Sequence, residues 1–252
     1  MQMELSLWLL LSFFGVAFLY ASVGFGGGSS YLAILTLAGM SYLMLRPAAL
    51  SCNLVVVGGS VFLFIKEGIL PWKKVLPLVA LSVPLAALGG ALQLNKSTYF
   101  PLLGGLLVLA AAGMFVQACY KVRVADAAEP AVRNSLWHLI VGGCIGFVSG
   151  LVGIGGGIFL APLLHLSDWD RPRVIAASAS FFILVNSVAG LAGLVWKDAF
   201  VVDWQVVGLL AAAVLLGGQL GSRMTLRWFS PTLIRVLTAL LILMVGGRLL
   251  LL

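Results

Sequence analysis

Long apolar stretches follow one another along almost the whole chain, and they limit the folds that are open to it. A helix needs about 20 mostly apolar residues to cross the hydrocarbon core of a bilayer. Residues 75–94, 100–120 and 175–196 meet this requirement. Of the 252 residues, 62% are hydrophobic and 9% are charged, whereas a soluble domain carries roughly a quarter charged residues. The sequence therefore predicts an all-α integral membrane protein, multi-pass in the cell inner (plasma) membrane.

The first 24 residues have the apolar character of a secretory signal peptide but lack its positively charged start. They contain Glu4 and neither Lys nor Arg, whereas a signal peptide begins with a basic region. The same segment has a counterpart in the second half of the chain. We therefore expect it to be part of the fold.

Cysteines and charges exclude several classes of function. Three cysteines lie far apart and form no C-x-x-C pair, namely Cys52, Cys119 and Cys144. In an apolar context they are typical of small packing residues, so we expect no metal or other cofactor. The formal net charge of +7 comes from Lys and Arg scattered over short loops, which is typical of topology determinants. We expect the lipid bilayer as a partner, and no nucleic acid.

The chain repeats itself over almost its full length. Residues 24–28 read GFGGG and residues 153–157 read GIGGG, and we call these two runs the first and second glycine tips. Residues 46–49, 69–72 and 84–89 match residues 173–176, 201–204 and 216–221 in the same order. Such internal symmetry is typical of membrane transporters. We expect a first repeat over residues 1–120, a cytoplasmic linker over 121–135 and a second repeat over 136–252.

Each repeat holds one glycine-broken segment, at residues 5–40 and 137–166, followed by three plain helices. If each broken segment crosses the membrane once, the fifteen Lys and Arg residues divide almost evenly between the two sides. If each is a hairpin, the second repeat is inverted and the basic residues become asymmetric, as the positive-inside rule requires. One side then holds Lys66, Lys73, Lys74, Lys121, Arg123, Arg133, Arg171, Arg173, Arg223, Arg227 and Arg235, and the other holds Arg46, Lys96, Lys197 and Arg248. We therefore expect inverted repeats of about ten helical pieces, with both chain ends outside.

Unwound backbone at the glycine tips needs partners, because lipid offers no hydrogen bonds. Glycine allows positive φ and lets a ligand approach the main chain. A helix that restarts after each tip would direct free N–H groups and its positive dipole end at an anion. The alternative is that the glycines only let helices pack closely, which we expect of seven others: Gly15, Gly58, Gly59, Gly89, Gly90, Gly104 and Gly105. The candidate substrate-binding residues at the tips are Gly26, Gly27, Gly28, Ser29, Gly155, Gly156 and Gly157.

The next helix of each repeat adds polar side chains at helical spacing. Asn53 and Ser60 are seven residues apart and share a face, and Ser180 and Ser187 repeat the arrangement. Their amide and hydroxyl donors suit sulfonate oxygens without burying a cation. Hydrogen bonding between helices is the alternative role.

Acidic residues are absent from the predicted mid-membrane regions. All eight fall in predicted loops or at helix ends, whereas carriers coupled to protons usually use an intramembrane carboxylate or His. The two histidines, His138 and His165, lie at the ends of the second broken segment, where we expect interfacial roles. An anion that leaves across an inside-negative membrane gains about 2.3 kcal/mol per charge per 100 mV. Export therefore needs no coupling ion.

The twin glycine tips, the A-x-x-x-N stretch at residues 49–53, its counterpart at 176–180, and Trp72 and Trp204 resemble the TauE/SafE sulfite exporter family. The likeness covers nearly the whole chain and implies export of sulfite or of an organosulfonate such as sulfoacetate. Ala179 stands where the family often has Thr or Ser, which puts one site hydroxyl in doubt. Uptake of a sulfur anion such as thiosulfate and a non-transporting accessory subunit stay open, as does a homo-oligomer. No motif indicates an enzyme.

Overall fold

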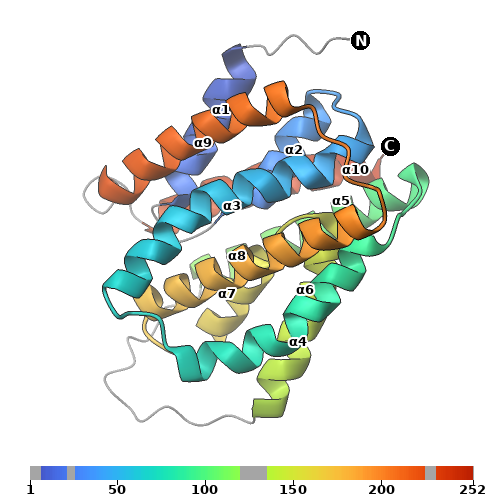
Figure 1. Cartoon of the computed structure of the whole chain (residues 1–252). Helices are drawn as coiled ribbons and strands as arrows, with labels where there is room; N and C mark the ends of the chain where they lie inside the picture. Colours follow the sequence, from blue (N-terminus) through green and yellow to red (C-terminus); the bar gives the residue numbers. More distant parts are fainter. Residues whose placement is uncertain (1–6, 22–25, 120–134, 225–230, 252) are drawn as a thin grey trace.

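The computed structural model describes residues 7–21, 26–119, 135–224 and 231–251, and within these ranges the chain is helical without strands (Figure 1). The all-α prediction is confirmed. Ten helices follow in order: α1 (Leu7–Ala21), α2 (Gly28–Leu37), α3 (Tyr42–Lys66), α4 (Trp72–Ala91), α5 (Lys96–Cys119), α6 (Ser135–Val152), α7 (Gly157–Leu166), α8 (Pro172–Trp196), α9 (Trp204–Met224) and α10 (Pro231–Leu250). The predicted linker, 121–135, lies almost wholly outside the described residues.

Five of the described helices, α3, α4, α5, α8 and α9, are long and apolar enough to cross a membrane. By contrast, α2 and α7 have 10 residues each, which corresponds to about 15 Å at 1.5 Å per residue. This is about half the hydrocarbon thickness. Neither of the two helices that follow the glycine tips is therefore long enough to cross the membrane by itself.

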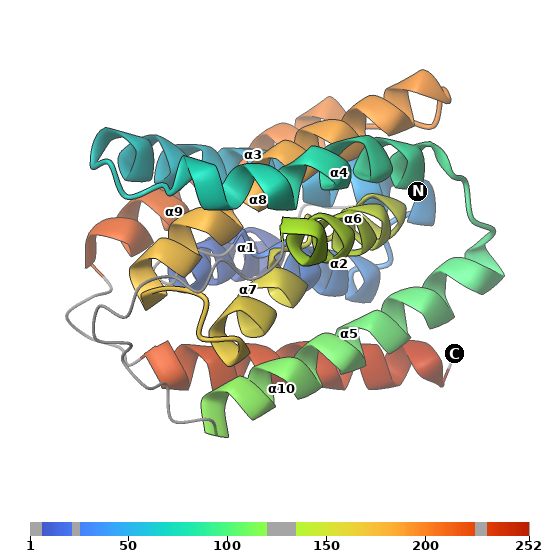
Figure 2. The same cartoon turned by 90° about the horizontal axis from the view of Figure 1, so that it is seen from below.

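The helices pack in reciprocal pairs. Helix α1 packs against α9, and α6, which is the counterpart of α1 in the second half, packs against α4. Helix α3 packs against α8 and α5 against α10, so each of these pairs joins equivalent helices. Figure 2 shows α5 and α10 side by side along one edge, with α2 and α7 between this pair and the helices α3 and α8. Both short helices are thus enclosed by long ones.

Glycines allow the closest of these pairs to form. On α6, Gly142, Gly146 and Gly150 lie one turn apart, and an added Cβ at any of them would overlap a carbonyl oxygen of α4. Gly217 and Gly221 on α9 have the same relation to carbonyl oxygens of α1. Small residues at this spacing let membrane helices approach backbone to backbone. Both reciprocal pairs therefore use the same packing mode.

The packing role expected for seven other glycines is only partly confirmed. Gly89, Gly90 and Gly104 each abut the backbone of another helix, and Gly59 lies against the side chain of Gln219. The prediction is wrong for Gly15, Gly58 and Gly105, which have nothing within 4 Å of an added Cβ. These three glycines lie on helix faces that do not pack against another helix. The sequence alone does not show which face of a helix will pack against a neighbour.

Two ion pairs join the α3–α4 loop and the start of α4 to the α7–α8 loop and the start of α8. Lys74 Nζ lies 2.6 Å from Asp170 Oδ2, and Arg173 lies 2.6 Å from Glu67 Oε2. Just beside them, Trp169 Nε1 donates to His138 Nε2 at 3.0 Å, which brings the start of α6 next to the residues that follow α7. These segments therefore lie at one end of the molecule.

A separate contact joins two other loops. Gln93 Nε2, after α4, donates to the carbonyl oxygen of Lys197, after α8, at 3.2 Å. The loop after α4 and the loop after α8 therefore lie together. Both α4 and α8 begin beside the ion pairs, so these two loops lie at the opposite ends of the two helices.

Candidate functional site

Both glycine tips contain left-handed backbone directly before a short helix. Gly27 and Gly156 hold equivalent N-cap positions of α2 and α7, each with φ of 82°. Gly153 and Gly155 also have positive φ, a region in which other residues are strained. Neither α2 nor α7 has a side-chain hydrogen bond at its N-cap. The N–H of Phe159 in the first turn of α7 bonds to the Gly156 carbonyl oxygen at 3.1 Å, whereas the earlier N–H groups of the two helices, at Gly28, Ser29, Gly157 and Ile158, have neither an intrahelical acceptor nor a side-chain cap.

The two tips meet at the side chain of Asn53, which is fully buried on α3. Its Nδ2 donates to the carbonyl oxygen of Ile154 at 3.1 Å. Its amide also lies against Gly26 and Gly28 of the first tip and against Gly155 of the second tip, close enough to meet a Cβ added at any of them. Asn53 thus bridges two segments that are more than a hundred residues apart in sequence.

Helix α8 contributes two residues to the same place. Ser187 Oγ lies 3.2 Å from a Cβ built on Gly155. Ile183 contacts Gly26, Gly155 and Gly157 and therefore touches both tips. The sequence analysis missed Ile183, although its position four residues before Ser187 places the two on one helix face.

Ser60 and Ser180 are buried on α3 and α8. Neither supplies one of the atoms nearest to a Cβ built on a described tip glycine, whereas Asn53 and Ser187 do. The Ala179 carbonyl oxygen, next to Ser180, lies 3.8 Å from a Cβ built on Gly157. The structure therefore brings Asn53 and Ser187 together at the tips.

A cavity of about 10 Å³ lies between the tips, lined by Gly26, Gly27, Gly28, Ser29 and Gly157 together with Tyr20, Ile154, Ile158 and Ile183. A space of this size accommodates roughly one water molecule. The tips are therefore in close contact and closed to larger ligands in this conformation.

Several buried polar atoms near the tips have no hydrogen-bond partner among the described residues. They include Asn53 Oδ1, Ser187 Oγ and the hydroxyl of Tyr31, which lies over Gly27. An unsatisfied buried polar group costs roughly 1–3 kcal/mol. Such a cost at three neighbouring positions is typical of a ligand site. Tyr31 is a further candidate that the sequence analysis missed, because its counterpart in the second tip is the apolar Leu160.

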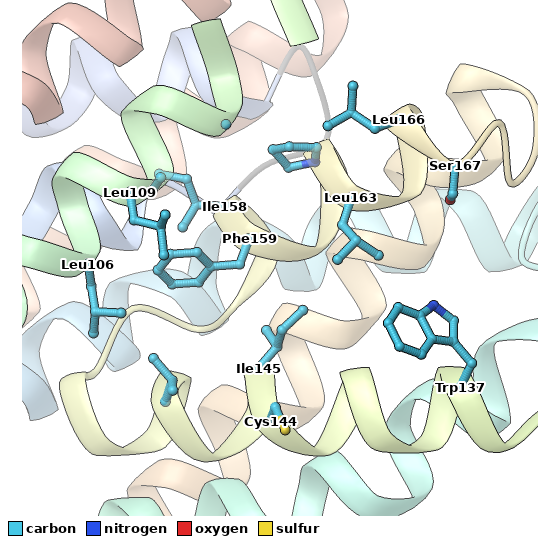
Figure 3. Close-up of a pocket in the computed structure, with 14 residues that line it drawn as sticks. Leu106, Leu109, Trp137, Cys144, Ile145, Ile158, Phe159, Leu163, Leu166 and Ser167 are labelled. Carbon is cyan, nitrogen blue, oxygen red and sulfur yellow. The ribbon is translucent and has the colours of Figure 1, made fainter. Parts of the chain in front are cut away.

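A much larger cavity, about 1170 Å³, opens between α5, α6 and α7 (Figure 3). Apolar side chains such as Leu109, Phe159 and Leu163 line it, and none of the described residues in its wall is charged. Ile158 belongs to the walls of both this groove and the tip cavity. The apolar groove does not suit a small anion, so size alone does not identify the site.

No acidic side chain lies near the tips among the described residues. Glu67, Asp168, Asp170, Asp198 and Asp203 all lie between helices. The other three acids of the sequence analysis fall outside the described residues. In this part of the chain no group of His, Cys, Asp and Glu is suited to hold a metal ion. The site thus offers N–H, amide and hydroxyl groups rather than carboxylates.

Comparison with known proteins places this geometry in context. The family model described as "Sulfite exporter TauE/SafE" matches residues 9–249. The "Probable membrane transporter protein y4hK" of Sinorhizobium fredii is 36% identical over 248 residues, which cover 96% of this chain and 97% of that protein. No solved structure matches the chain.

Two more distant relatives match over shorter stretches. The "Probable membrane transporter protein MJ0441" of Methanocaldococcus jannaschii is 25% identical over 189 residues, covering 71% of this chain and 68% of that protein. The "Probable membrane transporter protein YunE" of Bacillus subtilis is 28% identical over 120 residues, covering 47% and 43%. All three relatives carry names that describe membrane transport.

Proposed function

The chain belongs to the TauE/SafE sulfite exporter family, and on this premise we propose that it exports a small sulfur-containing anion, either sulfite or an organosulfonate such as sulfoacetate. Membership makes it a multi-pass membrane transporter and not an enzyme. The proposed part is the cargo, the direction of transport and the place where the anion binds.

The proposed architecture is a pair of inverted repeats, residues 1–120 and 136–252, in which each glycine-broken segment is a hairpin. If each segment crossed the membrane once, the loop between α3 and α4 and the loop between α7 and α8 would lie on opposite faces. The ion pairs Lys74–Asp170 and Arg173–Glu67 join these loops at 2.6 Å, which supports the hairpins. The hydrogen bond from Gln93 to the Lys197 carbonyl oxygen joins the loop after α4 to the loop after α8. These two loops also lie on the same face only if the broken segments are hairpins, so this bond supports the same arrangement.

Reciprocal packing also supports inverted repeats. Exchanging α1–α5 for α6–α10 converts the α1–α9 pair into the α6–α4 pair, and both pairs are present. The same exchange converts the contact between α2 and α10 into that between α7 and α5. Transporters built in this way bind their substrate near the midplane, at the interface between the repeats.

The observation that carries the binding proposal is the meeting of two uncapped helix N-termini around Asn53. Each N-terminus carries a partial positive charge of roughly half an elementary charge. First-turn N–H groups of α2 and α7 belong to residues that line the tip cavity, namely Gly28, Ser29, Gly157 and Ile158. Together with the Ser187 hydroxyl they form a donor set for anion oxygens. The tips must separate to admit the anion, because the closed cavity holds roughly one water molecule.

Export is favoured over uptake because the described part of the chain places no carboxylate near the tips. Uptake of an anion against an inside-negative potential needs a coupling ion, for which carriers usually keep an intramembrane acid or His. Flux into proteoliposomes separates the two directions. Transport that follows the imposed potential without a proton gradient is expected, and accumulation that requires a proton gradient would contradict export.

The binding site is tested by replacing a tip glycine. We expect purified protein to be stabilised against heat by sulfite or sulfoacetate more than by sulfate or taurine, since a ligand stabilises the state that it binds. Gly27→Val and Gly156→Val should abolish this stabilisation, because the new side chains meet the Tyr31 and Phe182 rings at positive φ.

Gly68→Val is the matched control for backbone strain, since Gly68 has φ of 66° and nothing within 4 Å of an added Cβ. It should leave anion stabilisation intact. Unchanged stabilisation in both tip variants would exclude the tips as the site.

A further inference from the structure

Arg46 on α3 is buried within the membrane-spanning part of the protein, with 7% of its surface exposed. Its guanidinium donates to four backbone carbonyl oxygens. Three belong to the end of α4, at Gly89 (3.1 Å), Gly90 (2.9 Å) and Leu92 (2.9 Å), and the fourth to Gly150 of α6 (2.9 Å). A buried Arg charge without a carboxylate is costly, so this arrangement is retained for a reason other than an ion pair.

Two further carbonyl oxygens around the second glycine tip are bound in the same manner. The Tyr99 hydroxyl on α5 donates to the carbonyl oxygen of Val152 at 3.0 Å, and Asn53 donates to that of Ile154 at 3.1 Å. Gly150, Val152 and Ile154 lie at or just after the end of α6, where carbonyl groups lose their intrahelical partners. Side chains from other helices thus bind alternate carbonyl oxygens through this break.

Unwound backbone offers an anion both N–H groups and carbonyl oxygens, which attract and repel it respectively. A carbonyl dipole turned toward the anion would oppose binding strongly, because electrostatic interactions are enhanced in the low-dielectric interior. A donor bound to a carbonyl oxygen reduces this repulsion. The bonds from Arg46 and Tyr99 also fix the end of α6, where the Gly153 and Ile154 N–H groups donate to the Ser149 carbonyl oxygen at 2.8 and 3.2 Å and from which the rest of the tip continues.

We propose that Arg46 and Tyr99 are positioning residues for anion transport, which hold the carbonyl oxygens of Gly150 and Val152 so that the second glycine tip presents its N–H groups to the anion. This inference rests on the proposed function. The Cα of Arg46 lies 3.0 Å, and its Cβ and Cγ lie 3.1 Å, from a Cβ built on Gly153, so the same residue limits movement of the tip's first glycine.

The other repeat supplies a control. Arg173 occupies the position that corresponds to Arg46 in the sequence repeat, but its side chain is 68% exposed and pairs with Glu67. It donates to no carbonyl oxygen of a glycine tip among the described residues. Replacing Arg173 therefore removes the same charge without affecting a tip carbonyl.

The test is a binding titration of the purified full chain with sodium sulfite, with sodium sulfoacetate as a second probe. Tyr99→Phe removes one hydroxyl and no charge, and should raise the Kd about three- to tenfold, as expected for one hydrogen bond. Arg46→Gln should raise the Kd at least about tenfold, since its hydrogen bonds are charge-assisted. Arg173→Gln should leave the Kd unchanged.

The melting temperature without anion separates positioning from a purely structural role. A structural role would lower that temperature and leave the Kd of the folded fraction unchanged. An unchanged Kd in Tyr99→Phe, or an equal rise in Arg173→Gln, would overturn the inference while the proposed function stands. If Arg46→Gln does not fold, Tyr99→Phe decides alone. Failure of the wild-type protein to bind either probe would overturn the proposed function, and the inference with it.

Discussion

Asn53 is the residue on which both halves of the candidate site depend. Its side chain touches Gly26 and Gly28 of one tip and Gly155 of the other, and it holds the Ile154 carbonyl oxygen. The corresponding residue of the second repeat is Ser180, which is buried on α8 but is not among the nearest neighbours of the described tip glycines. Ser187, seven residues later, is such a neighbour. The side chains nearest to the tips therefore differ in type and position between the two halves.

Asn53→Asp is predicted to remove anion binding. The carboxylate cannot donate to the Ile154 oxygen, and its negative charge would face both the anion and that oxygen in a buried place. We expect the sulfite Kd to rise at least about tenfold, which corresponds to roughly 1.4 kcal/mol. Isothermal titration of the purified protein measures this change.

Asn186→Asp is the control for that variant. Asn186 is equally buried on α8, but its amide donates to the Phe182 carbonyl oxygen of its own helix and is not among the nearest neighbours of the described tip glycines. It should lose stability without a selective loss of sulfite binding. Equal Kd values for the Asn53→Asp variant and the wild-type protein would rule out a direct role for Asn53.

Sequence repetition was sufficient to predict part of the site. Asn53, Ser187 and the tip glycines stand out because matched positions recur in both halves. Ile183 does not, since an apolar residue among apolar residues carries no signal, and Tyr31 does not, because its counterpart is Leu160. The Arg46 charge was interpreted as a loop determinant of topology, whereas the structure buries it against carbonyl oxygens. Two polar residues that share a helix face lie at different heights along the helix. Which of them lies next to the tips depends on how the helix is positioned against its neighbours, and the sequence pattern does not show this.

At the scale of elements, the pair of α4 and α6 depends on backbone contact. Gly146 faces Ser82 so closely that an added Cβ would lie 2.5 Å from its carbonyl oxygen. Gly146→Val should therefore force the two helices apart and destabilise the protein by roughly 1–3 kcal/mol or more. Thermal unfolding in detergent would detect a lower melting temperature.

Gly208→Val provides the comparison within a helix, because Gly208 on α9 has nothing within 4 Å of an added Cβ. A surface change of this kind usually alters stability by within about 0.5 kcal/mol. Similar melting temperatures for the Gly146 and Gly208 variants would show that close approach of α4 and α6 is not needed.

Element types and approximate bounds could be predicted from apolar length and from the glycine runs. A helix was expected to restart after each glycine tip, and α2 and α7 begin at the last glycine of each tip, Gly28 and Gly157. The helix partners could not be predicted. Glycines at 15, 58 and 105 have no close neighbour, whereas Gly142, Gly146 and Gly150 determine a helix pair. The difference depends on which helix faces meet.

At the scale of the whole molecule, the proposed inverted topology predicts which loops face each side. In a variant without native cysteines, Lys73→Cys should react only with reagent supplied from the cytoplasm, and Lys197→Cys only with reagent supplied from outside. Membrane-impermeant maleimide on intact cells and on inverted vesicles measures this sidedness. Labelling of both positions from the same side would contradict the hairpins.

The reciprocal pairing of α1 with α9 and α6 with α4 also bears on the energetics of transport. In a chain of two identical inverted halves, the inward-open and outward-open states would be related by a two-fold rotation and would have equal free energy. Any preference for one state must then come from positions where the two halves differ. Arg46, buried against four carbonyl oxygens, and Arg173, exposed beside Glu67, are such a position. With the proposed inverted repeats, the resting orientation of the transporter is set by such differences between the halves.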